Sequence, residues 1–168
     1  MQTTLAGQFL ILSAHDRLLQ AHTTGVMHAV TELARAGDEE RWNVYVWADG
    51  RLSLQNEKSR LWLSAEPDGR AICNRPKADE WEKWTLHAAG DLFHIGLKSA
   101  HGKWLCAQPP GQETRYGGEV VADRDACAEW ERFSILPSKQ GQLHDPIWWE
   151  AVGNAVGGAT ALKPIVVE

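Results

Sequence analysis

Hydrophobic and polar residues alternate over short stretches of the chain, and turns that contain glycine separate these stretches. Leu52-Ser53-Leu54 and Trp62-Leu63-Ser64 are two examples. Alternation with a period of two is typical of β-strands that bury one face. Short strands joined by tight turns pair in antiparallel fashion, so the pattern predicts an all-β fold.

A sequence word of acidic and aromatic residues occurs three times, twice clearly and once in altered form. The copies are EERWNV at 39–44, EWEKWTL at 80–86 and EWERFSI at 129–135. An aromatic residue closes each copy: Trp84 follows Trp42 by 42 residues, and Phe133 follows Trp84 by 49 residues. Repetition at this period indicates a chain built from three similar structural units.

A second word supports the same division into three units. It stands at 18–21, 62–65 and 104–107, and we expect a turn after each copy, at Gly25, Gly69 and Gly111. The seven extra residues of the third unit fit the stretch 109–118, whose Pro and Gly content indicates a long surface loop.

Units of this size, each with about four strands, are too small to bury their own apolar faces. We therefore expect them to close around a shared threefold axis. The sequence predicts a β-trefoil over residues 1–137 and a C-terminal extension over 138–168.

Two segments need a separate interpretation. The segment 26–36 has helix-forming composition, but its register with the other units predicts a strand with at most a helical turn at 33–36. In the extension, Asp145-Pro146 and the apolar residues after it predict a short helix over 146–156, followed by an extended segment over 161–167. Trp148 and Trp149 lie in that helix and either pack on the barrel or mediate self-association.

Composition narrows the class of protein. A chain of 168 residues with 43% hydrophobic content fits one domain, and a net charge of −5 argues against nucleic-acid binding. No stretch approaches the roughly 18 apolar residues of a membrane span, and the N-terminus has no basic leader region. Cys73, Cys106 and Cys127 lack metal-ligand spacing and are interpreted as reduced residues, so we expect a cytoplasmic protein.

Residue patterns that carry catalysis are missing from the sequence. The seven histidines form no i, i+4 pair and do not cluster with cysteine, so the sequence predicts no metal site and no cofactor. There is no Gly-x-Ser-x-Gly elbow and no phosphate-binding loop. Asp123 and Asp125 fall on opposite faces of an extended strand, which does not suit acid–base chemistry. The chain is therefore predicted not to be an enzyme.

Three stretches of the sequence, at 49–55, 82–87 and 119–125, resemble the fascin family of actin-crosslinking β-trefoils. The similarity covers about residues 8–137. It implies a protein-interaction module with the actin filament as partner. The alternative is a carbohydrate-binding, lectin-like β-trefoil, whose sugar sites would be of a different kind because the Gln-x-Trp word of ricin-type lectins does not occur here.

Candidate partner-binding residues are basic side chains near the turns and aromatic residues outside the core. Trp42 and Trp84 are assigned to the core, and Trp62 and Trp104 are expected to pack. The candidates are Lys58, Arg60, Lys98, His101, Lys103, Trp81, Trp130, Trp148 and Trp149.

Overall fold

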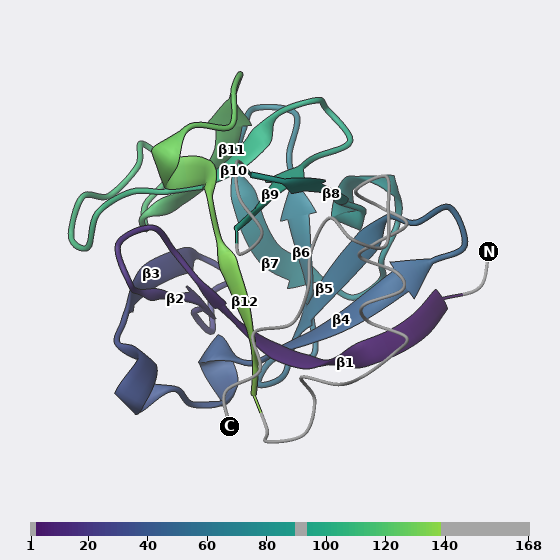
Figure 1. Ribbon diagram of the computed structural model, residues 1–168, viewed down its shortest axis with the longest axis horizontal. Coiled ribbons are helices and arrows are strands. Elements are labelled where there is room, and N and C mark those ends of the chain that lie inside the picture. The colour runs from purple at the N-terminus through teal and green to yellow at the C-terminus, as the bar shows by residue number, and fades with distance from the viewer. Residues whose placement is uncertain (1–2, 90–93, 139–168) are drawn as a thin grey trace.

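The computed structural model describes residues 3–89 and 94–138, which form three units of four strands each (Figure 1). The predicted β-trefoil is confirmed. The predictions for 146–156, 161–167, Trp148 and Trp149 lie outside the described residues. The strands are β1 (Thr3–Leu12), β2 (Leu18–Ala21), β3 (Met27–Thr31), β4 (Trp42–Trp47), β5 (Leu52–Asn56), β6 (Trp62–Ala65), β7 (Ala71–Arg75), β8 (Thr85–Ala88), β9 (Ile95–Lys98), β10 (Trp104–Ala107), β11 (Val120–Arg124) and β12 (Ser134–Pro137).

The first and fourth strands of the units form a closed barrel. Antiparallel ladders join β1 to β4, β4 to β5, β8 to β9 and β12 to β1. The bridges Leu52–Trp84 and Ile95–Phe133 complete the circle, and each contains two reciprocal backbone hydrogen bonds of 2.7–2.9 Å. Closure satisfies the backbone groups that an open sheet edge would expose.

The second and third strands of each unit form a hairpin, and the three hairpins meet at their third strands, β3, β7 and β11. The backbone N–H of Cys73 donates to the carbonyl of Gly25 at 2.9 Å, and that of Ala122 donates to Gly69 at 2.7 Å. Both glycines have positive φ, 92° and 97°, which glycine adopts without strain. Each turn is thereby tied to the next unit.

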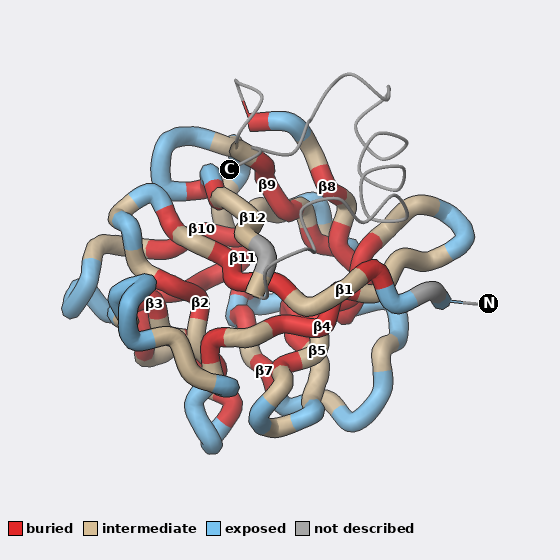
Figure 2. Tube along the Cα trace, turned by 60° about the horizontal axis from the view of Figure 1, so that its bottom comes forward, coloured by how far each residue is buried: buried red, intermediate tan, exposed pale blue. Residues whose placement is uncertain are grey.

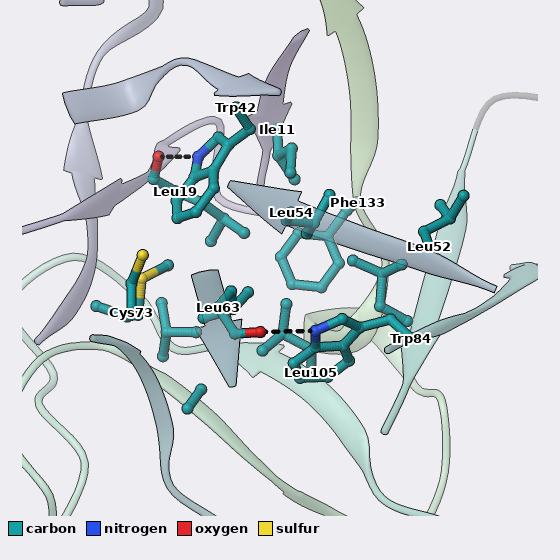
Figure 3. Close-up of a cluster of buried hydrophobic side chains, with 14 of the residues drawn as sticks. Ile11, Leu19, Trp42, Leu52, Leu54, Leu63, Cys73, Trp84, Leu105 and Phe133 are labelled. Atoms are coloured by element: carbon teal, nitrogen blue, oxygen red, sulfur yellow. Dashed lines mark hydrogen bonds between the residues drawn. The ribbon is translucent and has the colours of Figure 1, made fainter. Parts of the chain in front are cut away.

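The three aromatic residues that close the repeated word fill the core. Trp42, Trp84 and Phe133 are 0% exposed, and buried positions follow the strands through the centre of the molecule (Figure 2). The indole Nε1 of Trp42 donates to the Leu19 carbonyl at 3.1 Å, and that of Trp84 donates to Leu63 at 3.2 Å (Figure 3). Phe133 occupies the third place in the same cluster.

The acidic residues of the repeated word form a structural turn. Short 3-10 helices lie before the closing aromatic residues: η2 (Asp38–Glu40), η3 (Glu80–Glu82) and η4 (Glu129–Glu131). The last glutamate of each is buried, and its Oε1 accepts a hydrogen bond from the backbone N–H three residues earlier at 2.8–2.9 Å. This contact satisfies a helix N-terminal donor and explains why this glutamate is present in every unit.

The segment 26–36 forms β3 and a single 3-10 turn, η1 (Leu33–Arg35), as predicted. Gly111 lies in a turn, as predicted, but the turn of the third unit that is equivalent to those at Gly25 and Gly69 comes later in the long loop. Its hydrogen bonds, Gly117 to Thr114 and Thr114 to Gly118, match those at Gly25 and Gly69, whereas Gly111 lies earlier in the long loop.

In residues 3–89 and 94–138, no helix is long and apolar enough to cross a membrane.

Cysteine reactivity tests the packing of the core. Cys73, Cys106 and Cys127 are free thiols, and burial raises the pKa of Cys73 and of Cys106 to about 12. Because the thiolate is the reactive form, we expect both to resist Ellman's reagent at pH 8, while the partly exposed Cys127 reacts first. Mass spectrometry of the labelled sites would check this order, with urea-unfolded protein as the fully reactive control. Rapid labelling of Cys73 in native protein would contradict the packing.

Candidate functional site

Two tryptophans lie on the outer surface of the 3-10 turns. In η3, Glu82 is held inward as the turn's acceptor and Trp84 enters the core, which leaves Trp81 on the outer side and 40% exposed. In η4 the same arrangement leaves Trp130 37% exposed. Tryptophan is enriched among the residues that contribute most to binding, so these exposed side chains are candidate contact residues.

A histidine from the following unit faces each of these tryptophans. The ring of His101, in the turn after β9, lies 5.4 Å from Trp81 between centroids, at an interplanar angle of 61°. The ring of His15, in the turn after β1, lies 5.4 Å from Trp130 at 69°. Both are edge-to-face contacts, a preferred geometry for aromatic pairs. We name these two places the tryptophan–histidine junctions.

The junction between the first and second units has no ring pair and is held by hydrogen bonds to the main chain of η2. Glu39 stands where the other units have tryptophan, and the side-chain amide of Asn56 donates to its carbonyl at 2.8 Å. The backbone N–H of Lys58 donates to the carbonyl of Asp38 at 3.2 Å. Within the described residues, the aromatic pair is therefore present at two of the three equivalent junctions.

The histidine turns are held in place by hydrogen bonds. The backbone N–H of His101 donates to Oγ of Ser99, and that of His15 donates to Oγ of Ser13, both at 3.2 Å. Nε2 of His101 lies 2.9 Å from the carbonyl oxygen of Ala65. Because a carbonyl only accepts, Nε2 carries the proton in this contact and Nδ1 is left as an acceptor in the neutral ring. The turn is therefore preorganised.

A shallow hollow adjoins each surface tryptophan. The hollow at Trp81 has a volume of about 490 Å³ and the one at Trp130 about 290 Å³. Each hollow is lined by an arginine from the end of its unit's third strand, a glutamate before the tryptophan and the buried glutamate after it. The residues that line the first are Arg75, Pro76, Lys77, Asp79, Glu80, Trp81 and Glu82, and those that line the second are Arg124, Ala128, Glu129, Trp130 and Glu131.

The carboxylate of Glu80 is fixed by basic neighbours. The Arg51 guanidinium donates to both of its oxygens at 2.9 and 3.1 Å, and Lys83 donates at 3.3 Å. The hydrogen bonds from Arg51 are the main reason that the pKa of Glu80 falls to about 2. At neutral pH this side chain is therefore an ionised acceptor beside the Trp81 hollow.

The hollows have the chemistry to bind a molecule with one apolar face and a polar rim. A tryptophan ring provides a flat apolar surface, while arginine and carboxylate groups at its edge donate and accept hydrogen bonds. Charges of both signs line each hollow, so the ligand has no need of a strong net charge. The geometry fits a ligand that is held by apolar contact with the ring and oriented by hydrogen bonds at the rim.

Three of the residues singled out from the sequence lie at the junctions, namely Trp81, Trp130 and His101. Lys58 lies at the junction that has no ring pair. Trp148 and Trp149 lie outside the described residues. The role of all of these residues in binding stays a prediction.

The remaining basic candidates are engaged in local contacts. Arg60 pairs with Glu57 at 3.2 Å, and Lys103 pairs with Asp125. The ammonium of Lys98 lies 5.5 Å from the ring centroid of Trp104. These contacts are on or near the surface and contribute little to stability.

The sequence interpretation missed His15 and the arginines of the hollows. Their spacing gives a signal: His15 and His101 each stand three residues before the second strand of their unit. Arg75 and Arg124 each stand nine residues before the closing aromatic residue. Equal spacing in two units was detectable, but the pairing of a turn in one unit with a tryptophan in another required the fold.

Comparison with solved structures agrees with the trefoil architecture. ThreeFoil, a designed threefold-symmetric protein, matches with a TM-score of 0.64 at 18% identity, over 77% of this chain and 98% of its own. SeviL, solved with an asialo-GM1 saccharide, matches at 0.62 and 16%, over 81% and 100%. The Haemophilus ducreyi cytolethal distending toxin matches at 0.65 and 12%, over 79% and 84%. No family profile and no curated protein sequence matches the chain. The chain is thus a β-trefoil protein, and at these identities the likeness concerns the fold alone.

Proposed function

We propose that this chain is a non-catalytic, glycan-binding β-trefoil that holds saccharides at the two tryptophan–histidine junctions. The observation that carries the proposal is the recurrence of one surface arrangement in two units: a half-exposed tryptophan, a histidine at its edge and a hollow with arginine and glutamate. The core does not require a tryptophan here, because Glu39 occupies the equivalent place in the first unit.

Saccharide chemistry fits this arrangement. The C–H groups of a sugar ring form an apolar face that packs on an aromatic ring, while its hydroxyls need donors and acceptors around the edge. At Trp81, those groups are the Arg75 guanidinium and the ionised Glu80 carboxylate. Mixed charge at the rim favours neutral saccharides over strongly acidic ones.

The SeviL structure supports the same class of ligand, because that protein was solved with a saccharide on a trefoil scaffold. Two shallow sites in one chain also suit multivalent binding, in which several weak sites engage one surface. Each site binds weakly by itself, but two sites that engage one multivalent surface raise the overall affinity by about 10²–10⁴-fold.

The test is a glycan array with the purified full chain, followed by calorimetric titration of each neutral saccharide that binds. We expect two equivalent or near-equivalent sites per chain. Unlabelled saccharide should compete for the array signal. If no saccharide is retained at high protein concentration, or if titration fits a single site, the assignment to the two junctions is wrong.

Actin filaments are the second candidate ligand, and the resemblance to fascin in the sequence favours them. Co-sedimentation at low and physiological salt tests this directly, with a second chain that ends at Leu136 to assign any binding to the extension. Pelleting that survives physiological salt and is insensitive to the saccharide would favour actin over glycan. A cytoplasmic location and self-association through the extension remain predictions of the sequence.

A further inference from the structure

In the turn of the third unit, a side-chain carboxylate accepts a backbone hydrogen bond that a main-chain carbonyl accepts in the turns of the other two units. The backbone N–H of Ala29 occupies the same place in β3 as that of Cys73 in β7 and that of Ala122 in β11. Those two donate to glycine carbonyls, but Ala29 donates to Oε1 of Glu119 at 3.1 Å. Two consecutive glycines, 117 and 118, both with positive φ, precede Glu119 and change the path of the turn.

A charged group at this position is costly unless it is compensated. Glu119 is only 2% exposed, and a neutral carbonyl would satisfy the Ala29 amide equally well, as the other units show. Among the described residues, the one basic side chain paired with Glu119 is His28, whose Nδ1 lies 3.2 Å from Oε1. Buried carboxylates are retained where a positive charge or a metal ion faces them.

A second carboxylate completes the cluster. Glu113 comes from the long loop that is specific to the third unit, and it is exposed. The donor atoms of His28, Glu113 and Glu119 all lie within 4.8 Å of one another. The three residues come from β3, the long loop and the position just before β11, which explains why their positions in the sequence gave no metal-binding pattern.

We propose that His28, Glu113 and Glu119 form a site for one divalent transition-metal ion of the Zn²⁺ type. One imidazole and two carboxylates suit Zn²⁺, whereas Ca²⁺ prefers six or more oxygen ligands. Tetrahedral zinc with bonds of about 2.0 Å holds its ligand atoms about 3.3 Å apart. The exposed Glu113 side chain closes the remaining gap by changing rotamer, and water fills the fourth position.

Calorimetric titration of the metal-free full chain with ZnCl₂ tests the site, and CaCl₂ tests its selectivity. We expect one Zn²⁺ per chain at this site, a rise in melting temperature with Zn²⁺ and a much weaker response to Ca²⁺. Glu113→Gln should weaken Zn²⁺ binding at least tenfold. This variant should still fold, since the side chain is exposed.

Two further variants and two controls make the test specific. His28→Gln and Glu119→Gln should also weaken Zn²⁺ binding, and Glu119→Gln keeps an oxygen that accepts from Ala29. Glu32→Gln, at an exposed glutamate, and His101→Asn, at a tryptophan–histidine junction, should bind Zn²⁺ like the wild type. Absence of a one-to-one site, or equal Zn²⁺ affinity in Glu113→Gln and the controls, would overturn the proposal. Titration of the chain with glycan in the presence of EDTA, which removes metal ions, tests the tryptophan–histidine junctions separately from the metal site.

Discussion

Replacing Trp81 and Trp130 together with alanine should reduce glycan binding below detection while the protein stays folded. Each substitution removes the flat apolar surface of one junction, and aromatic contacts at binding sites are each worth about 1–3 kcal/mol. For a weak site this loss of about 10- to 100-fold takes binding out of the measurable range. Array binding and calorimetry would measure the effect, and a thermal melt would check the fold.

Single variants and a control sharpen this prediction. Trp81→Ala should leave one functional site, at Trp130, and so halve the stoichiometry rather than abolish binding. Leu33→Ala removes an apolar side chain of similar exposure from a different unit, and it should bind like the wild type. Wild-type binding by the double variant would exclude the junctions as the saccharide sites.

Replacing Trp84 with alanine should bring the domain close to unfolding. The side chain is 0% exposed at the centre of the core, and truncations of this kind cost about 3–5 kcal/mol. Domains of this size have unfolding free energies of about 5–15 kcal/mol, so the loss is a large fraction of the total. Urea unfolding followed by circular dichroism would measure it.

The third unit supplies the matched control for Trp84. Phe133 fills the equivalent core position, so a phenylalanine ring is compatible with this packing. Trp84→Phe should cost about 1–3 kcal/mol, mainly because the Leu63 carbonyl loses its indole donor. If Trp84→Phe is as destabilising as Trp84→Ala, the proposed equivalence of the three core positions is wrong.

The fold could be predicted from the sequence because repetition and core packing leave the same mark in every unit. Trp42, Trp84 and Phe133 recur once in each unit because each closes one third of the barrel. The buried glutamates of the 3-10 turns recur because each turn needs an acceptor for the same backbone N–H. Residues that perform one structural task in three places are visible as a pattern.

The candidate sites could be predicted only in part, because they lie between units. The sequence placed Trp81 and Trp130 among the aromatic residues outside the core, and the structure shows both as exposed. Their histidine partners come from turns elsewhere in the chain, and no local pattern states which turn meets which tryptophan.

In the third unit, the turn equivalent to those at Gly25 and Gly69 was predicted at the wrong glycine for a related reason. Gly111 and Gly117 both have positive φ and both lie in a hydrogen-bonded turn, so glycine content alone could not distinguish them. The hydrogen bonds within the turn, Gly117 to Thr114 and Thr114 to Gly118, decide that Gly117 is equivalent to Gly25. The later position of this turn brings the buried carboxylate of Glu119 into contact with β3. Neither repeated sequence word contains a counterpart of this residue.

Nuclear magnetic resonance of the tryptophan side chains shows whether the two junctions bind saccharide. The nine indole N–H groups of the ¹⁵N-labelled full chain are assigned with single tryptophan variants and then titrated with a saccharide selected on the array. We expect the resonances of Trp81 and Trp130 to shift together and saturably, while those of the core Trp42 and Trp84 do not move. Saturable shifts confined to other tryptophans, with Trp81 and Trp130 unchanged, would contradict this expectation.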